Sequence, residues 1–125
     1  MFTYYNANPA GIQTEDCAYR ALSSFLRTTW MQALLNLVLH AANKGGVNFT
    51  HITNITSFLQ SKGYERQKPP HRMTVRKFIE DVALEGKAYF LTLEHPRHAT
   101  FISPDKELLD IGDCSDKYVK YYWER

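Results

Sequence analysis

A change in hydrophobic spacing near Gly86 constrains the fold more than any other feature of this sequence. Before this glycine, apolar residues recur three or four positions apart, as on one face of a helix, whereas after it they form short runs rich in β-prone residues. The first part predicts helices over residues 16–27, 29–45, 55–62 and 74–86. The second part predicts strands over residues 88–93, 99–102, 107–111 and 117–123. Helices followed by an antiparallel meander place the chain in the α+β class.

Capping residues support these helix boundaries. Asp16 is a suitable N-cap for the first helix, and Thr74 for the fourth. Thr29 followed by Gln32 has the form of a capping box, which predicts the start of the second helix. Residues 1–15 are rich in turn formers and predict an irregular lead-in.

The composition of the chain limits the classes of partner that it can be expected to have. A chain of 125 residues with 44% hydrophobic content predicts one domain over residues 1–125. The net charge of +2 gives no electrostatic reason to expect a nucleic-acid partner. The longest apolar run, residues 33–42, is too short to cross a bilayer, so we expect no membrane partner. The two cysteines, Cys17 and Cys114, follow an N-terminus without an export pattern, which favours reduced thiols and a cytoplasmic location.

Cys17 is the first candidate for chemistry. It lies where the polar lead-in gives way to the apolar pattern of the first predicted helix, and therefore in that helix's first turn. Unpaired backbone N–H groups and the positive end of the helix dipole lower the pKa of a thiol placed there. Such a cysteine is suited to nucleophilic attack if another segment supplies a base. The alternative is that Cys17 is a small buried side chain that contributes only to core packing.

His98 is the candidate base, because it stands at the head of a short apolar strand late in the chain. If residues 103–106 form the turn after this strand, His98 faces Ile111 and Asp113 lies diagonally beside the imidazole on the same face. Asp113 is therefore the favoured third member of a triad. A slip of one residue or a bulge selects Asp110 instead, which stays as the alternative. The competing interpretation of His98 is an ordinary edge-strand histidine.

The order of these residues resembles the papain-like cysteine peptidases. In that family a cysteine on the first helix is followed by a histidine on a late strand and then by an acid, here about fifteen residues further on. Within the family, the chain is similar to small bacteriocin-processing and phage-type peptidases and to ovarian-tumour-type deubiquitinases. It also resembles uncharacterised bacterial and phage proteins of papain-like type. The matching segments span nearly the whole chain: Asp16-Cys17, Arg20-Ala21, Arg72-Met73-Thr74-Val75, His98, Asp113-Cys114-Ser115-Asp116 and Tyr122-Trp123.

The resemblance implies a papain-like fold and a thiol hydrolase that cleaves a peptide or isopeptide bond through a thioester, with a protein or peptide substrate and no cofactor. Papain-like enzymes usually carry an oxyanion-hole glutamine about six residues before the cysteine, a position that Gly11 occupies here. Gln13 is the nearest glutamine and is the oxyanion candidate, with Asn6 and Asn8 further back. The backbone N–H of Cys17 can supply one donor in any case.

Two other functions remain open on sequence alone. A protein-binding module that keeps the peptidase shape without its chemistry, such as a phage-encoded inhibitor of a host factor, fits the displaced glutamine. An amidase or transglutaminase uses the same kind of triad. His95, His98 and Cys114 offer metal-ligand types, but the chain has no Cys-x-x-Cys pair and no His-Glu-x-x-His helix, so we expect no metal.

Overall fold

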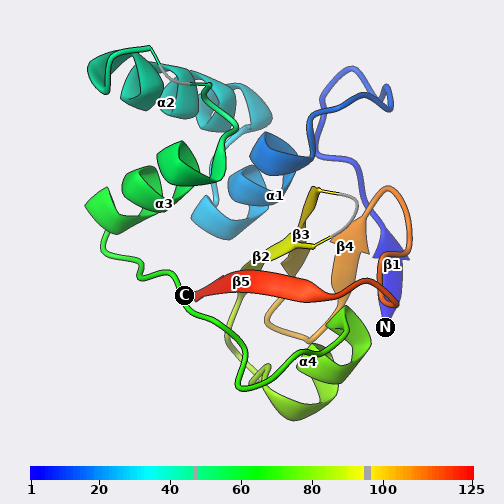
Figure 1. The fold of residues 1–125 in the computed structure, drawn as a ribbon. Helices are drawn as coiled ribbons and strands as arrows, with labels where there is room; N and C mark the ends of the chain where they lie inside the picture. Colours follow the sequence, from blue (N-terminus) through cyan, green and yellow to red (C-terminus); the bar gives the residue numbers. More distant parts are fainter. Residues whose placement is uncertain (47, 95–96) are drawn as a thin grey trace.

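The protein has an α+β fold, as the hydrophobic spacing predicts (Figure 1). A computed structural model describes residues 1–46, 48–94 and 97–125. The helices are α1 (Cys17–Leu26), α2 (Trp30–Asn43), α3 (Ile52–Ser61) and α4 (Val75–Asp81). The strands are β1 (Phe2–Tyr4), β2 (Tyr89–Leu93), β3 (His98–Ile102), β4 (Leu108–Asp110) and β5 (Val119–Glu124). Among the described residues, no helix has the length and apolar character to cross a membrane.

The five strands form one mixed sheet in the order β1-β4-β3-β2-β5. The pairs among β2, β3, β4 and β5 are antiparallel, whereas β1 runs parallel to β4. The chain therefore starts at one edge of the sheet and ends at the other, as the positions of N and C in Figure 1 show. β1 was not expected, because the lead-in predicts irregular structure; its pairing partner lies about a hundred residues away.

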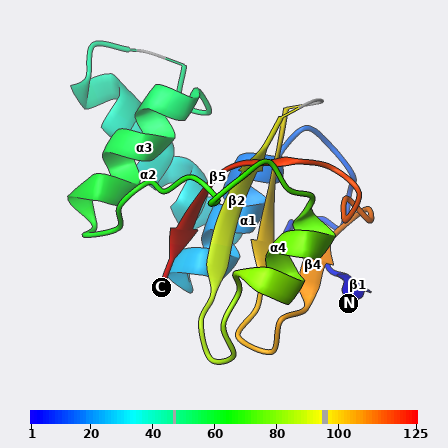
Figure 2. The ribbon, with the colours of Figure 1, turned by 60° about the horizontal axis from the view of Figure 1, so that its bottom comes forward.

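Helices cover both faces of the sheet (Figure 2). Alternation along β2 directs Phe90 to one side and its neighbours Tyr89 and Leu91 to the other. Phe90 belongs to a core that joins the sheet to α1, α2 and α3. Tyr89 and Leu91 belong to a second core, which joins the sheet to α4. The second core packs α4 against one face of the sheet, and α1 lies against the opposite face.

Most helix boundaries agree with the capping residues. Asp16 is the N-cap residue of α1, and Thr29 and Gln32 form the complete capping box of α2. Thr74 caps α4 by accepting a hydrogen bond from the Lys77 N–H. Two helices differ from prediction. α3 begins at Ile52, earlier than expected, because the side chain of His51 caps it, and α4 ends at Asp81, well before Gly86.

The turn between β3 and β4 decides which residues of the two strands face each other. Ser103 donates its N–H to the Glu107 carbonyl at 2.9 Å, and Lys106 donates its N–H to the Ser103 carbonyl at 2.9 Å. Lys106 has a left-handed φ of 66°. This is a three-residue hairpin loop, a type I turn followed by a left-handed residue, rather than a two-residue loop closed by residues 103 and 106. Ile102 consequently pairs with Leu108, not with Glu107 as the shorter loop predicts.

Substitution of Lys106 tests the role of its left-handed backbone. Lys106→Gly should raise the free energy of unfolding by up to about 1 kcal/mol, because glycine adopts this conformation without steric cost. Lys106→Val should lower it by about 1 kcal/mol or more, because a β-branched residue tolerates positive φ poorly. Urea unfolding of both variants measures the difference. Equal stabilities would contradict a left-handed residue at this position.

Candidate active site

Cys17 is the first residue of α1, directly after the N-cap Asp16. Arg20 donates the first intrahelical hydrogen bond, from its N–H to the Asp16 carbonyl at 3.0 Å. The N–H groups of Cys17 and of the next two residues therefore precede the hydrogen-bonded part of the helix. The side chain of Cys17 is half-buried, and both cysteines of the chain are free thiols. This is the position that the sequence predicts for the nucleophile.

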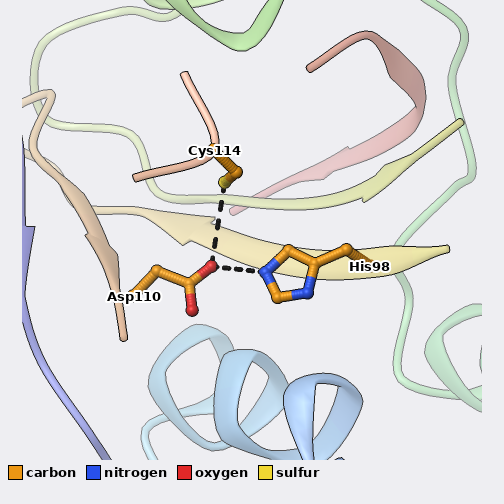
Figure 3. A group of neighbouring side chains, drawn as sticks. All are labelled: His98, Asp110 and Cys114. Atoms are coloured by element: carbon orange, nitrogen blue, oxygen red, sulfur yellow. Dashed lines mark hydrogen bonds and ion pairs between the residues drawn. The ribbon is translucent and has the colours of Figure 1, made fainter. Parts of the chain in front are cut away.

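His98 begins β3, and its imidazole lies between Cys17 and Asp110. Its Nε2 atom is 2.6 Å from Oδ2 of Asp110 (Figure 3). The same ring lies close enough to Cys17 to lower the pKa of its thiol. Because Nε2 faces the carboxylate, Nδ1 is the nitrogen left for the sulfur, and Figure 3 shows it directed away from Asp110. The structure thus brings a thiol, an imidazole and a carboxylate together in series.

The carboxylate in this series is Asp110, the alternative, and not the favoured Asp113. Asp113 is exposed and accepts a hydrogen bond from the Ser115 N–H at 2.9 Å. The hairpin explains the difference. With Phe101 paired to Leu109, one further step places Asp110 opposite Thr100, two residues from His98 and on the same strand face. The three-residue loop moves the register by one position, and that shift changes which acid meets the imidazole.

The three groups set one another's charge states. Burial opposes charge on the imidazole, but its hydrogen bonds, chiefly to Asp110, raise the pKa of His98 to about 11. Burial also opposes charge on Asp110, but the hydrogen bond and charge of His98 lower the pKa of this carboxyl to about 2. Burial raises the pKa of the Cys17 thiol, yet hydrogen bonds from His98 and from the Ala99 N–H lower it below its ordinary value. The raised pKa of His98 and the lowered pKa of Cys17 both act in favour of an ion pair between the imidazole and the sulfur.

Arg20 connects this site to the start of α1. Its Nε donates to Oδ1 of Asp16 at 2.6 Å, which is the i to i+4 pair that the helix spacing predicts. Its Nη1 donates to Oδ1 of Asp110 at 3.0 Å. All three side chains are buried. One guanidinium therefore neutralises two buried carboxylates and holds Asp110 with the oxygen Oδ2 turned to His98.

Asp16 collects further donors that the sequence does not indicate. Its Oδ2 accepts from Asn8 Nδ2 at 3.2 Å and from the indole N–H of Trp30 at 2.9 Å. The Asp16 side chain makes no capping bond to α1, although it occupies the N-cap position. It instead ties the lead-in and the start of α2 to Arg20. The Asp-x-x-x-Arg spacing indicates the ion pair, but no local pattern indicates Asn8 or Trp30 as partners.

The side chains expected to donate to an oxyanion are exposed or make hydrogen bonds elsewhere. Gln13 is exposed in the lead-in. Asn6 donates its side-chain amide to the Ile12 carbonyl at 2.9 Å, and the amide of Asn8 is engaged by Asp16. The backbone N–H of Cys17 lies ahead of the helical hydrogen bonds and is the donor that remains.

Cys114 also reaches this cluster. Its thiol lies 3.8 Å from Oδ2 of Asp110, the oxygen that contacts His98 (Figure 3), and it contributes to the raised pKa of His98. Ligand-type atoms of His98, Asp110 and Cys114 all lie within 4.8 Å of one another. His95, the other histidine that the sequence offers as a metal ligand, lies outside the described residues.

Removal of Arg20 should destabilise the fold through the two carboxylates that it leaves behind. We expect Arg20→Met to lower the free energy of unfolding by about 3–5 kcal/mol, the usual effect of breaking a buried ion pair from one side. Arg20→Lys should recover only part of this, because an ammonium lacks the planar fork that contacts both acids. Urea unfolding at neutral pH measures both variants. An Arg20→Met protein as stable as the parent would contradict this role.

Comparison with models of known protein families, with curated proteins and with solved structures found no match. The chemistry of this site is therefore inferred from the arrangement of its own side chains.

Proposed function

We propose that the chain is a cysteine-dependent hydrolase of papain-like type that cleaves a peptide or isopeptide bond. The observation that carries the proposal is the series Cys17–His98–Asp110, in which the imidazole is 2.6 Å from the carboxylate and lowers the pKa of the neighbouring thiol. A thiol at a helix start beside an imidazolium meets the requirements for an activated cysteine nucleophile. The triad acid in this proposal is Asp110, in place of Asp113.

In the first half of the reaction, the Cys17 thiolate attacks the substrate carbonyl carbon, and the carbonyl π electrons move to oxygen. The backbone N–H of Cys17 donates to this oxyanion. The imidazolium of His98 gives a proton to the leaving amine as the C–N bond breaks. The products of this half are the free amine and a thioester on Cys17.

In the second half, neutral His98 takes a proton from a water molecule as its oxygen attacks the thioester. Collapse of the second tetrahedral intermediate releases the carboxylic acid and restores the thiolate and the imidazolium. Asp110 keeps Nε2 protonated throughout, so that Nδ1 is the nitrogen that exchanges protons with the reacting groups. Neither half requires a cofactor.

A protein-binding module without catalysis is the second candidate, and the position of Gln13 favours it. An exposed glutamine in the lead-in does not resemble a fixed oxyanion donor. The two functions predict different results for Cys17→Ala. Loss of activity in the protein's biological assay supports the hydrolase, whereas an unchanged effect supports the module.

The pH dependence of Cys17 alkylation tests the activated thiol. Because the pKa of Cys17 is lowered from an ordinary value of 9.0, its reaction with iodoacetamide should rise with pH with a midpoint below that value. In His98→Ala the midpoint should move upward, because burial remains while the imidazolium is lost. We expect alkylation at pH 6 to slow by about tenfold or more. Peptide mass spectrometry assigns the adduct to Cys17, and an unchanged midpoint in His98→Ala would exclude the ion pair.

A matched pair of acid variants tests the assignment of Asp110. Asp110→Asn should lower the rate of Cys17 alkylation at pH 6 and of peptide hydrolysis by on the order of a hundredfold, because the imidazolium loses its charged partner. Asp113→Asn, an exposed change three residues away, should stay within about twofold of the parent. The reverse order of effects would return the triad role to Asp113.

A further inference from the structure

We propose that His98, Asp110 and Cys114 form an inhibitory binding site for a thiophilic divalent cation of the zinc class. The inhibitory role rests on the proposed function, whereas the metal site itself does not depend on catalysis. Cys114 takes no part in the triad, yet its sulfur lies 3.8 Å from Oδ2 of Asp110, the oxygen that faces His98. The three side chains supply a thiolate, an imidazole nitrogen and a carboxylate oxygen, which are ligand types that Zn²⁺ takes.

The spacing of these atoms is close to that of a tetrahedral site. Zinc bonds of about 2.0 Å to N or O and about 2.3 Å to S place neighbouring ligand atoms roughly 3.3–3.8 Å apart. Cys114 Sγ and Asp110 Oδ2 are already 3.8 Å apart, and the whole set lies within 4.8 Å. His98 Nε2 and Asp110 Oδ2, at 2.6 Å, share a proton now. Replacing that proton with a metal requires the two atoms to separate by about 0.7 Å.

Outer contacts already hold the ligands in place. Oδ1 of Asp110 accepts from Arg20 at 3.0 Å and from the Ile111 N–H at 2.7 Å, which leaves Oδ2 for the metal. Hydrogen bonds of this kind orient ligating carboxylates in metal sites. Asp110 and Cys114 are buried, whereas the His98 side chain is 25% exposed and gives access from solvent. The three ligands leave a fourth position open for water.

A metal on Nε2 is incompatible with the proposed reaction. The imidazolium that protonates the leaving amine carries protons on both ring nitrogens, and the metal takes one of these two positions. The ring then retains only its Nδ1 proton and cannot accept another from the Cys17 thiol. Metal binding and hydrolysis therefore compete for the same nitrogen.

The test uses Co²⁺ and Zn²⁺ added to the reduced chain of residues 1–125. Co²⁺ should bind once per chain with a near-ultraviolet thiolate-to-cobalt absorption, and Zn²⁺ should displace it. The Cys17→Ala variant keeps all three ligands and should show the same absorption. Cys114→Ser should lose the absorption and bind Zn²⁺ at least about tenfold more weakly. Circular dichroism of each variant checks folding, and His98→Ala provides a second ligand variant if Cys114→Ser does not fold.

Each outcome bears on the proposal. Absence of saturable Co²⁺ binding, or an absorption lost in Cys17→Ala and kept in Cys114→Ser, would overturn the site. Because Cys17→Ala has no nucleophile, metal binding by this variant stands even if the hydrolase proposal fails. For the inhibitory role, saturating Zn²⁺ should slow Cys17 alkylation at pH 6 in the parent chain, with recovery after chelation. Bound Zn²⁺ without any slowing would leave a metal site and refute inhibition.

Discussion

The buried guanidinium of Arg20 is the interaction on which the rest of this structure depends. It is 6% exposed and lies between Asp16 and Asp110, which are 0% and 2% exposed. Two carboxylates at this depth are costly unless a positive charge compensates them. Arg20 also joins two distant segments, since Asp16 is the N-cap of α1 and Asp110 ends β4. The same ion pairs that make the acids tolerable therefore fix the helix carrying Cys17 against the hairpin carrying His98.

The parts of the site that depend on local pattern could be predicted. The helix start at Cys17, the i to i+4 pair of Asp16 with Arg20 and the strand start at His98 each follow from a few neighbouring residues. The identity of the acid could not, because it depends on the number of residues in one turn. Pro104 is compatible with either loop length. No sequence pattern indicates that Lys106 adopts a left-handed backbone conformation. The left-handed φ of Lys106 belongs to a loop that shifts the register of β3 and β4 by one residue. This shift places Asp110 instead of Asp113 beside the imidazole.

Contacts between distant segments account for the remaining differences. β1 forms because Phe2–Tyr4 pairs with the edge of β4. The residues around Phe2–Tyr4 do not indicate this partner. Asn8 and Trp30 meet Asp16 only after the lead-in and α2 have packed around α1. Cys114 is buried, as a structural cysteine is expected to be, but its contact with Asp110 depends on the loop that follows β4. Sequence spacing specifies elements well and specifies their meeting points poorly.

Charges alternate in sign along the site, and this alternation links stability to reactivity. Asp16, Arg20, Asp110, His98 and Cys17 follow one another through direct contacts, each opposite in charge to the next when Cys17 is a thiolate. Each group therefore lowers the cost of charging its neighbours, which explains why the pKa of Asp110 falls while that of His98 rises. The charge of Arg20 also lowers the pKa of the Cys17 thiol, but less than His98 does, whereas Arg20 contacts both buried acids directly. The inner end of the series thus serves mainly to hold the fold together, and the half-buried end is where protonation can change during a reaction.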